Sequence, residues 1–358
     1  MLKKTIAQLD PYIPETPLAD LEKATGVAKI TRLSANENPL GTSPAVKTAI
    51  QHFDFSTTRL YPDGDANALR QAVATKLNVD ANQLLFGCGL DEVIELTART
   101  FLEVGDEVVE PWPTFGEYKL HCQIEGANII DVPVLDDGNF DLPGLIQAIT
   151  PKTKLLWLCN PNNPTGTYTP LADLRKLLKQ VPAHVLVMID EAYMEFVTQE
   201  NGSAIQLLNE FDNIVVMRTF SKIYGLAAMR VGYAIIPKAL ISAMQAVRLP
   251  YNLNSVSQVA ALAALNDHEF VQTMQQTIAS ARTQFEAFFD EAGLTYCPSQ
   301  ANFIFFEAPQ ADELHQYLLQ HGYLLRNGLK PGWLRLTFGS DSDNATIQAL
   351  INRFYATK

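Results

Sequence analysis

The stretch LLWLCNPNNPTGTYTPLADLRKLLKQVPAHVLVMID, residues 155–190, decides the fold of this 358-residue chain. It begins with an apolar run of strand length, residues 155–159, and continues through a turn-rich loop. Leucines and a valine then recur at helical spacing over residues 171–181, and a second apolar run, residues 184–189, ends at Asp190. Strand, helix and strand in this order predict a βαβ unit of a mainly parallel sheet with both faces covered.

The same alternation extends in both directions from this unit. Short, mostly β-branched apolar runs occupy residues 107–109, 129–133, 214–217 and 231–236, while residues 68–77 and 91–101 have helical composition or spacing. We therefore expect an α/β fold in which a mainly parallel central sheet is flanked by helices. Sheets of this kind bind ligands at the carboxyl ends of their strands.

The two ends of the chain have a different character. Prolines and turn formers dominate the first forty-odd residues, which predicts an extended arm. After Pro250, two long helical patterns (residues 255–265 and 269–289) precede two strand-like runs (residues 301–306 and 333–338). The expected division is an N-terminal arm with a small-domain segment (1–45), a large domain that contains the central sheet (46–250) and a smaller α+β C-terminal domain (251–358).

Composition excludes several classes of protein. The 39 acidic and 27 basic side chains give a formal charge of −12, and we see no basic patch that could bind nucleic acid. The N-terminus lacks the apolar stretch of a signal peptide, and apolar runs are too short to span a membrane. Neither the four cysteines nor the six histidines show metal-ligand spacing. We expect a soluble, cytoplasmic protein that needs no metal.

The segment Thr219-Phe220-Ser221-Lys222, followed by Arg230, carries the strongest chemical pattern. A lysine amine can form an imine with an aldehyde, and the flanking hydroxyls and guanidinium can hold a phosphate. An isolated serine–lysine pair is more often an exposed lysine beside capping hydroxyls. The interpretation therefore depends on the other motifs.

Three further motifs follow apolar strands. Asp190 ends a buried run, and a buried carboxylate needs a cationic or hydrogen-bonding partner such as a pyridinium nitrogen. The stiff loop from Asn160 to Gly166 can aim an amide at the same ligand, and we predict a cis peptide before Pro164. The glycine-rich turn before Leu90 can bring helical N–H groups to a phosphate. Each motif alone is also compatible with a helix cap, a plain turn or a simple connection.

Taken together, these segments resemble the fold-type I pyridoxal-phosphate enzymes, specifically class I and II aminotransferases of the histidinol-phosphate aminotransferase kind. The matching pieces occur in the family's order over nearly the whole chain: Ala35-Asn36-Glu37-Asn38-Pro39, Tyr61-Pro62-Asp63, Gly89-Leu90-Asp91-Glu92, Pro113-Thr114-Phe115-Gly116, Pro161-Asn162-Asn163-Pro164-Thr165-Gly166, Asp190-Glu191-Ala192-Tyr193, Thr219-Phe220-Ser221-Lys222 with Arg230, and Leu334-Arg335-Leu336-Thr337-Phe338-Gly339.

The resemblance implies pyridoxal 5′-phosphate as cofactor and assigns roles around it. Lys222 is the Schiff-base lysine and the base that moves the substrate proton, and Asp190 pairs with the pyridine nitrogen. Asn163 and Tyr193 contact the phenolate oxygen, and Phe115 stacks on the ring. The expected phosphate ligands are the backbone amides of Leu90, Asp91 and Glu92, with Thr219, Ser221 and Arg230. Tyr61 reaches the cofactor of a neighbouring subunit, which implies a homodimer, while Asn38 and Arg335 bind the substrate carboxylate.

The substrate expected from the resemblance is histidinol phosphate, transaminated with 2-oxoglutarate or glutamate by a ping-pong mechanism in histidine biosynthesis. One site must then accept either a phosphate or a carboxylate, and guanidinium groups can bind both. We expect Arg326 and Arg335, with Tyr12 of the arm, to form this anion pocket. An exposed ion pair is the alternative for Arg326. Glu15 stands where relatives commonly carry glycine.

Other functions remain open at this point. The nearest alternative is an aminotransferase for phenylalanine or tyrosine, and a second is a decarboxylase of threonine phosphate. A pyridoxal-phosphate-binding transcription regulator would need a DNA-binding domain ahead of the body. Only about forty residues precede the body here, without a basic helical pair. A catalytically inactive scaffold is disfavoured because competent residues fill every core position.

Overall fold

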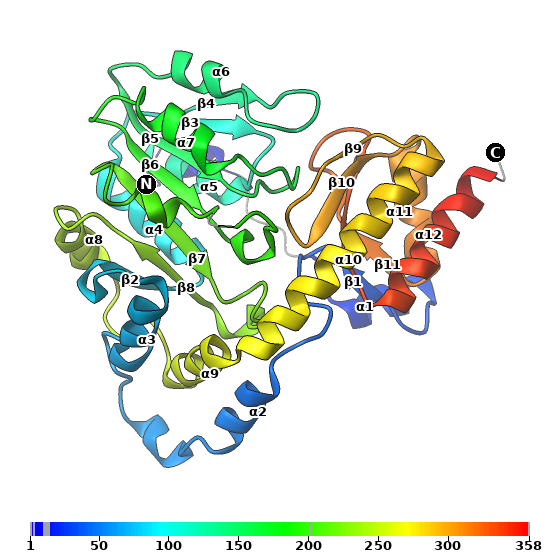
Figure 1. Ribbon diagram of the computed structural model, residues 1–358, viewed down its shortest axis with the longest axis horizontal. Helices are drawn as coiled ribbons and strands as arrows, with labels where there is room; N and C mark the ends of the chain where they lie inside the picture. Colours follow the sequence, from blue (N-terminus) through cyan, green and yellow to red (C-terminus); the bar gives the residue numbers. More distant parts are fainter. Residues whose placement is uncertain (1, 3, 10–14, 201, 357–358) are drawn as a thin grey trace.

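The computed structural model describes residues 2, 4–9, 15–200 and 202–356 and contains a seven-stranded sheet and two small sheets. The large sheet has the order β2-β8-β7-β6-β5-β3-β4 (Figure 1). Its strands are β2 (Leu84–Cys88), β3 (Glu107–Trp112), β4 (Asn128–Pro133), β5 (Thr153–Cys159), β6 (Leu186–Asp190), β7 (Ile214–Thr219) and β8 (Val231–Ile235). Only β8 runs antiparallel to its neighbours, β7 and β2. The expected α/β fold with a mainly parallel sheet is confirmed.

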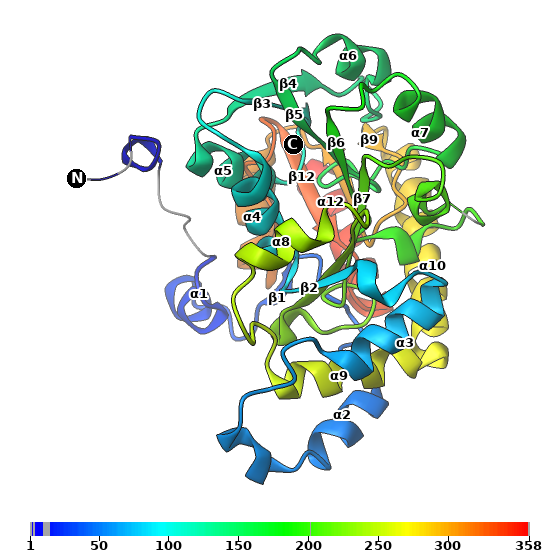
Figure 2. The same cartoon turned by 90° about the vertical axis from the view of Figure 1, so that its left-hand side faces the viewer.

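Helices lie on both faces of this sheet. Figure 2 shows α4 and α5 on one side and α7 on the other. The helices of this part are α2 (Pro44–Gln51), α3 (Asn67–Leu77), α4 (Leu90–Phe101), α5 (Gly116–Glu125), α6 (Leu142–Gln147), α7 (Leu171–Leu178), α8 (Ile241–Val247) and α9 (Ser255–Asn266). Strands β5 and β6 are buried along their whole length except at Lys154, as expected for strands covered on both faces.

The C-terminal part packs around two small sheets. Strands β12 (Trp333–Thr337), β10 (Phe303–Glu307) and β9 (Tyr296–Cys297) form one antiparallel sheet. Strands β1 (Thr31–Leu33) and β11 (Tyr323–Leu325) form the other and run parallel. The remaining α-helices are α1 (Leu18–Thr25), α10 (His268–Ala292), α11 (Ala311–Gln320) and α12 (Asp341–Ala356). No helix among the described residues is long and apolar enough to cross a membrane.

From Glu15 onward, the N-terminal segment differs from the extended arm that the sequence predicts. Helix α1 begins directly after Pro17, and β1 pairs with β11 of the C-terminal part. Proline blocks a helix interior but is compatible with a helix start, so Pro17 marks the beginning of α1 and does not continue an extended segment. Helix α1 buries none of its residues, and Glu22 fastens it by accepting a hydrogen bond from the N–H of Ile30 at 2.9 Å.

The sheet topology explains how distant motifs come together. Strands β2, β3, β5, β6 and β7 point in one direction, so their carboxyl ends lie at the same edge. Helix α4 begins two residues after the end of β2, Asp190 is the last residue of β6, and Lys222 lies three residues after the end of β7. This edge is where the sequence predicts the ligand.

Candidate active site

Lys222 lies at this edge, half-buried, and its hydrogen bond within the described residues is not to a carboxylate. Its Nζ donates to the carbonyl of Ala35 at 3.2 Å and sits 5.7 Å from the centre of the Tyr193 ring. Burial and, to a smaller extent, the nearby Arg335 guanidinium lower the pKa of Lys222 to about 8. A substantial fraction of the amine is therefore neutral near physiological pH, which nucleophilic attack on an aldehyde requires.

Asp190 is a buried acid with two donors already in place. The hydroxyl of Tyr118 donates to Oδ2 at 2.6 Å, and the N–H of Ala192 donates to Oδ1 at 2.9 Å. Burial raises the pKa of Asp190 to about 6, while these two hydrogen bonds oppose the rise. A cationic ring nitrogen is the kind of partner that stabilises such a carboxylate. Tyr118 was not among the residues predicted from the sequence.

The loop that carries Asn163 is fixed by its own side chains. The side-chain amide of Asn160 donates to the carbonyl of Thr169 at 3.0 Å, and the side-chain oxygen of Asn160 accepts from the N–H of Thr169 at 2.7 Å. The amide of Asn162 donates to the carbonyl of Pro113 at 3.0 Å. The peptide bond between Asn163 and Pro164 is cis, which confirms the prediction; the bonds before Pro113 and Pro161 are also cis and were not predicted.

Asn163, Tyr193 and Arg335 form one polar cluster beside Lys222. The Asn163 amide donates to the Tyr193 hydroxyl at 3.4 Å, and the guanidinium of Arg335 donates to the oxygen of Asn163. Arg335 is 6% exposed, and burial lowers its pKa to about 10. Its Nε is buried without a hydrogen-bond partner among the described residues. A buried guanidinium with an unused donor is suited to binding an anion.

Asn36, which sequence reasoning missed, belongs to this cluster, whereas Asn38 does not. The Asn36 amide donates to the Tyr193 hydroxyl at 2.9 Å. The Asn38 amide instead donates to the carbonyl of Ile223 at 2.8 Å, and its oxygen accepts from the N–H of Leu40 at 2.9 Å. Asn38 thus ties its loop to the segment after Lys222, and its predicted contact with a substrate carboxylate stays untested.

The expected phosphate ligands gather around the start of α4. No side chain of the described residues caps this helix. The guanidinium of Arg230 donates to Asp91 at 2.9 Å, and a Cβ at Gly89 would collide with it. Free helical N–H groups beside a guanidinium form an anion site. Thr219 and Ser221 are buried nearby at the end of β7, where the hydroxyl of Thr219 accepts from the N–H of Ser221 at 3.1 Å.

Three other predicted residues make further contacts within the described structure. Phe115, directly before α5, meets the Tyr118 ring edge to face with centroids 5.5 Å apart. Arg326 pairs with Glu15 at 3.3 Å. Tyr61 is 81% exposed and stacks on Tyr251 at 4.7 Å, so within one chain it lies on the surface. Tyr12 lies outside the described residues.

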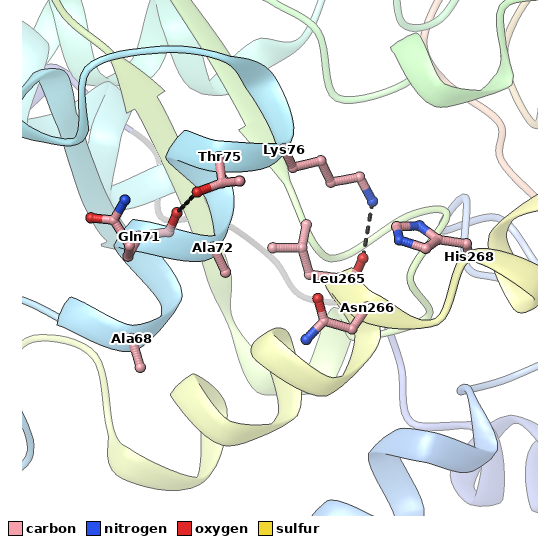
Figure 3. Close-up of a pocket in the computed structure, with 8 residues that line it drawn as sticks. All are labelled: Ala68, Gln71, Ala72, Thr75, Lys76, Leu265, Asn266 and His268. Atoms are coloured by element: carbon pink, nitrogen blue, oxygen red, sulfur yellow. Dashed lines mark hydrogen bonds between the residues drawn. The ribbon is translucent and has the colours of Figure 1, made fainter.

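A separate pocket of about 410 Å³ offers a second lysine, Lys76, between α3 and α9 (Figure 3). Its lining residues are Ala68, Gln71, Ala72, Thr75, Lys76, Leu265, Asn266 and His268. The Lys76 amine donates to the carbonyl of Leu265 at 3.0 Å, and no acid occurs in that lining. The pocket shares none of the residues around Lys222. Among residues 2, 4–9, 15–200 and 202–356, no group of three or more histidine, cysteine or acidic side chains could hold a metal.

The residues around Lys222 fit pyridoxal phosphate. The partly neutral amine of Lys222 can react with an aldehyde, and the buried carboxyl of Asp190 can pair with a ring nitrogen. The uncapped start of α4, together with Arg230, can bind a phosphate. Asn163 and Tyr193 supply polar groups between these points. The donors and charges required by each part of that cofactor are therefore present at one edge of the sheet.

Comparison with known proteins agrees with this site. Residues 28–354 match the family described as aminotransferase class I and II. The histidinol-phosphate aminotransferase of Lactiplantibacillus plantarum is 51% identical over 99% of this chain and 100% of its own length, and that of Limosilactobacillus fermentum is 46% identical over 98% of each. The crystal structure of histidinol-phosphate aminotransferase from Sinorhizobium meliloti in complex with pyridoxal-5′-phosphate superposes with a TM-score of 0.89, at 27% identity, over 99% of this chain and 98% of that one. The protein belongs to the class I and II aminotransferase family.

Proposed function

We propose that this chain is a pyridoxal-phosphate-dependent aminotransferase that transfers the amino group of histidinol phosphate to 2-oxoglutarate, as a homodimer in the cytoplasm. The observation that carries the proposal is the meeting of Lys222 and Asp190 at one edge of the large sheet with Arg335, which comes from β12 of a small sheet. Relatives named histidinol-phosphate aminotransferase, 51% and 46% identical over nearly full length, support the choice of substrate.

The chemistry divides between the cofactor and the side chains. When bound, pyridoxal phosphate supplies an aldehyde that takes up amino groups and a ring that accepts the electron pair left by proton loss. Asp190, as a carboxylate, pairs with the ring nitrogen and keeps that nitrogen protonated. The amine of Lys222 would hold the cofactor and would act as the base that accepts the substrate proton at Nζ and gives it back.

Anion binding is assigned to the polar cluster at the other end of the site. Arg335 presents a buried guanidinium whose Nε has no partner among the described residues. Its pKa of about 10 keeps it cationic at neutral pH, so it can hold the carboxylate of glutamate or the phosphate of the donor. Asn163 and Tyr193 connect Arg335 to Lys222, which supports the proposed contact of both residues with the phenolate oxygen.

The alternative substrates have weaker support. L-threonine-O-3-phosphate decarboxylase from Porphyromonas gingivalis shares the fold, with a TM-score of 0.78, but its 24% identity shows nothing beyond the fold. Every residue named for the proton transfer serves aromatic amino acids equally well. We prefer histidinol phosphate over aromatic amino acids because Arg326 and Arg335 can bind an anion and because the relatives are named histidinol-phosphate aminotransferase.

Exposed aromatic side chains support the proposed homodimer, and the free cysteine thiols support the proposed cytoplasmic location. Tyr61 and Tyr251 form an exposed aromatic pair, with Phe55, Leu60 and Leu249 also exposed on the same two segments. Apolar surface of this kind is typical of a protein interface. All four cysteines are free thiols, as expected in a reducing compartment. We also propose the division 1–45, 46–250 and 251–358 into arm, large and small domains, with α9 of the last range packed against α2 and α3 of the large domain.

Reduction with borohydride tests the cofactor site. Protein reconstituted with pyridoxal phosphate should become yellow, and borohydride should fix the cofactor to Lys222, as peptide mapping would locate it. Lys222→Met should abolish the label. Lys76→Met is the matched control, because Lys76 is a second lysine that lines a pocket and whose pKa is lowered by desolvation, and it should leave the label unchanged. A label on Lys76, or one spread over many lysines, would reject the assignment.

Steady-state kinetics with 2-oxoglutarate as acceptor test the substrate. We expect kcat/KM for histidinol phosphate to exceed the values for phenylalanine and tyrosine. If phenylalanine were preferred by orders of magnitude, the substrate would be wrong while the assignment of Lys222 stood.

A further inference from the structure

Tyr118 is buried behind Asp190, on the sheet side of the candidate site. It lies in the first turn of α5 and is 0% exposed, and its hydroxyl donates to Oδ2 of Asp190 at 2.6 Å. The other oxygen of Asp190 accepts from the N–H of Ala192. Each carboxylate oxygen therefore has one donor from the protein and keeps lone pairs for a third partner.

The ring of Tyr118 is held on two sides. It stacks on Trp157 of β5, with centroids 4.5 Å apart and planes 6° apart. Phe115 meets it edge to face, with planes at 80°. A ring packed in this way cannot swing its hydroxyl away from Asp190 without disturbing the buried strand β5. The hydrogen bond is therefore a fixed feature of the fold.

The charged groups around Asp190 make this donor important. Asp91 and Glu191 oppose the ionisation of Asp190, as does burial. Glu191 is itself neutralised by Arg218, at 2.8 Å. The buried Cys159 thiol stays protonated because burial raises its pKa far above neutral. The Tyr118 hydroxyl also remains protonated, since burial raises its pKa well above its ordinary value, so it acts only as a donor to Asp190. A donor to the charged form favours that form.

We propose that Tyr118 is a positioning residue that keeps the Asp190 carboxylate ionised and oriented toward the cofactor ring nitrogen. It acts through Asp190 and has no contact of its own with substrate. The proposal rests on the proposed function, because it requires that Asp190 face pyridoxal phosphate. It goes beyond that function in assigning a role to a residue on α5.

The affinity of the cofactor-free protein for pyridoxal phosphate, measured as a function of pH, tests this role. In Tyr118→Phe the carboxylate loses its charge-assisted hydrogen bond, so Asp190 should ionise about one to two pH units higher than in the wild type. The pH at which cofactor affinity is half lost on acidification should rise by the same amount, with affinity recovered above that pH. Ionisations of the cofactor itself are common to all variants and cancel in the comparison.

Tyr296→Phe is the matched control. Tyr296 also donates to an aspartate, Asp290 at 3.1 Å, but it lies in the C-terminal part and outside the cluster around Lys222. We expect this variant to keep the wild-type pH profile. Trp157→Phe retains the Tyr118 hydroxyl while weakening its stacking, and should shift the profile in the same direction by less. It also provides the test if Tyr118→Phe does not fold.

The outcomes separate this proposal from the proposed function. An unchanged pH profile in Tyr118→Phe, or a loss of cofactor affinity that no rise in pH restores, would overturn the positioning role. Borohydride labelling of Lys222 in the wild type tests the function independently. Labelled wild type with an unshifted Tyr118→Phe rejects only the positioning role, whereas unlabelled wild type rejects the function on which it rests.

Discussion

Glu15 holds the guanidinium of Arg326 in the described structure. Its Oε1 lies 3.3 Å from Nη1 of Arg326, and its Oε2 accepts a hydrogen bond from the Ser34 hydroxyl at 2.8 Å. The carbonyl of the same serine accepts from Arg335. A carboxylate of the N-terminal segment therefore lies against one of the two arginines that we propose for anion binding, and the ion pair predicted as the alternative role of Arg326 is present.

Replacing Glu15 should strengthen the binding of anionic substrates. In Glu15→Gln, Arg326 loses its internal counter-ion, and we expect KM for histidinol phosphate and for glutamate to fall by up to about fivefold, as exposed ion pairs of about 0.2–1 kcal/mol allow. The doubly charged phosphate should gain more than a single carboxylate. Initial-rate kinetics at constant ionic strength measure the effect.

Asp20→Asn is the control for this variant, because it removes the same charge from an exposed position on α1. It should leave KM for both substrates within error of the wild type. If Glu15→Gln raised KM instead, Glu15 would be supporting Arg326 as a substrate ligand, and the competition argued above would be wrong.

Asp190 should make the cofactor-free protein less stable at neutral pH. Its folded-state pKa of about 6 lies above the unfolded value of 3.8, so the folded state binds the proton more tightly. Stability from this group is therefore fully present below about pH 4 and is lost as pH rises through about 6. The difference of about 2 units corresponds to about 3 kcal/mol.

Asp190→Asn removes this penalty, and urea unfolding of the cofactor-free proteins measures it. The variant should be more stable than the wild type at pH 7, by up to about 3 kcal/mol. The difference should vanish near pH 4. In the presence of pyridoxal phosphate the order should reverse, because only the wild type gains strong stabilisation from the ligand. A wild type that is the more stable one at pH 7 without cofactor would contradict the pKa assigned here.

Arg218 should be among the residues on which stability depends most. It is 7% exposed and binds the fully buried Glu191 at 2.8 Å and Glu195 at 2.7 Å. Arg218→Met leaves Glu191 buried without its cation, which typically costs about 3–5 kcal/mol. Chemical unfolding at pH 7 measures the loss. Arg175→Met, which breaks an exposed pair with Glu210, should cost at most about 1 kcal/mol.

The residues that sequence analysis placed well are those that follow parallel strands. Asp190, Asn163 and Lys222 are far apart in sequence, but Asp190 ends β6, and Asn163 and Lys222 come shortly after β5 and β7, which run parallel to β6. Strand order and register then bring them together. The direction of β8 was not foreseen, because an apolar run reads the same in either direction and β8 returns through a short loop.

The residues that were missed depend on side-chain orientation and on long-range contacts. Asn36 and Asn38 occur in one motif, yet only Asn36, with its positive φ of 56°, reaches Tyr193. Nothing in the local sequence distinguishes the two. Tyr118 looks like an ordinary buried aromatic of a helix, and its partner lies 72 residues later. The pairing of Glu15 with Arg326 spans 311 residues.

Hybrid dimers should show whether Tyr61 serves the neighbouring subunit. Tyr61 is exposed within its own chain, stacked on Tyr251, so we expect its contribution to be made across an interface. A hybrid of Lys222→Met and Tyr61→Ala subunits then has one site with both native residues and one site with neither. Co-expressed, separately tagged subunits, purified through both tags, should be clearly more active at limiting pyridoxal phosphate than either parent.

A hybrid of Lys222→Met and Asp190→Asn subunits is the control, because both changes fall in the site of their own chain and leave each site defective. The intact site of the Tyr61→Ala hybrid combines Lys222 of one subunit with Tyr61 of the other. If this hybrid gained no more activity than the control, Tyr61 would not act across the interface.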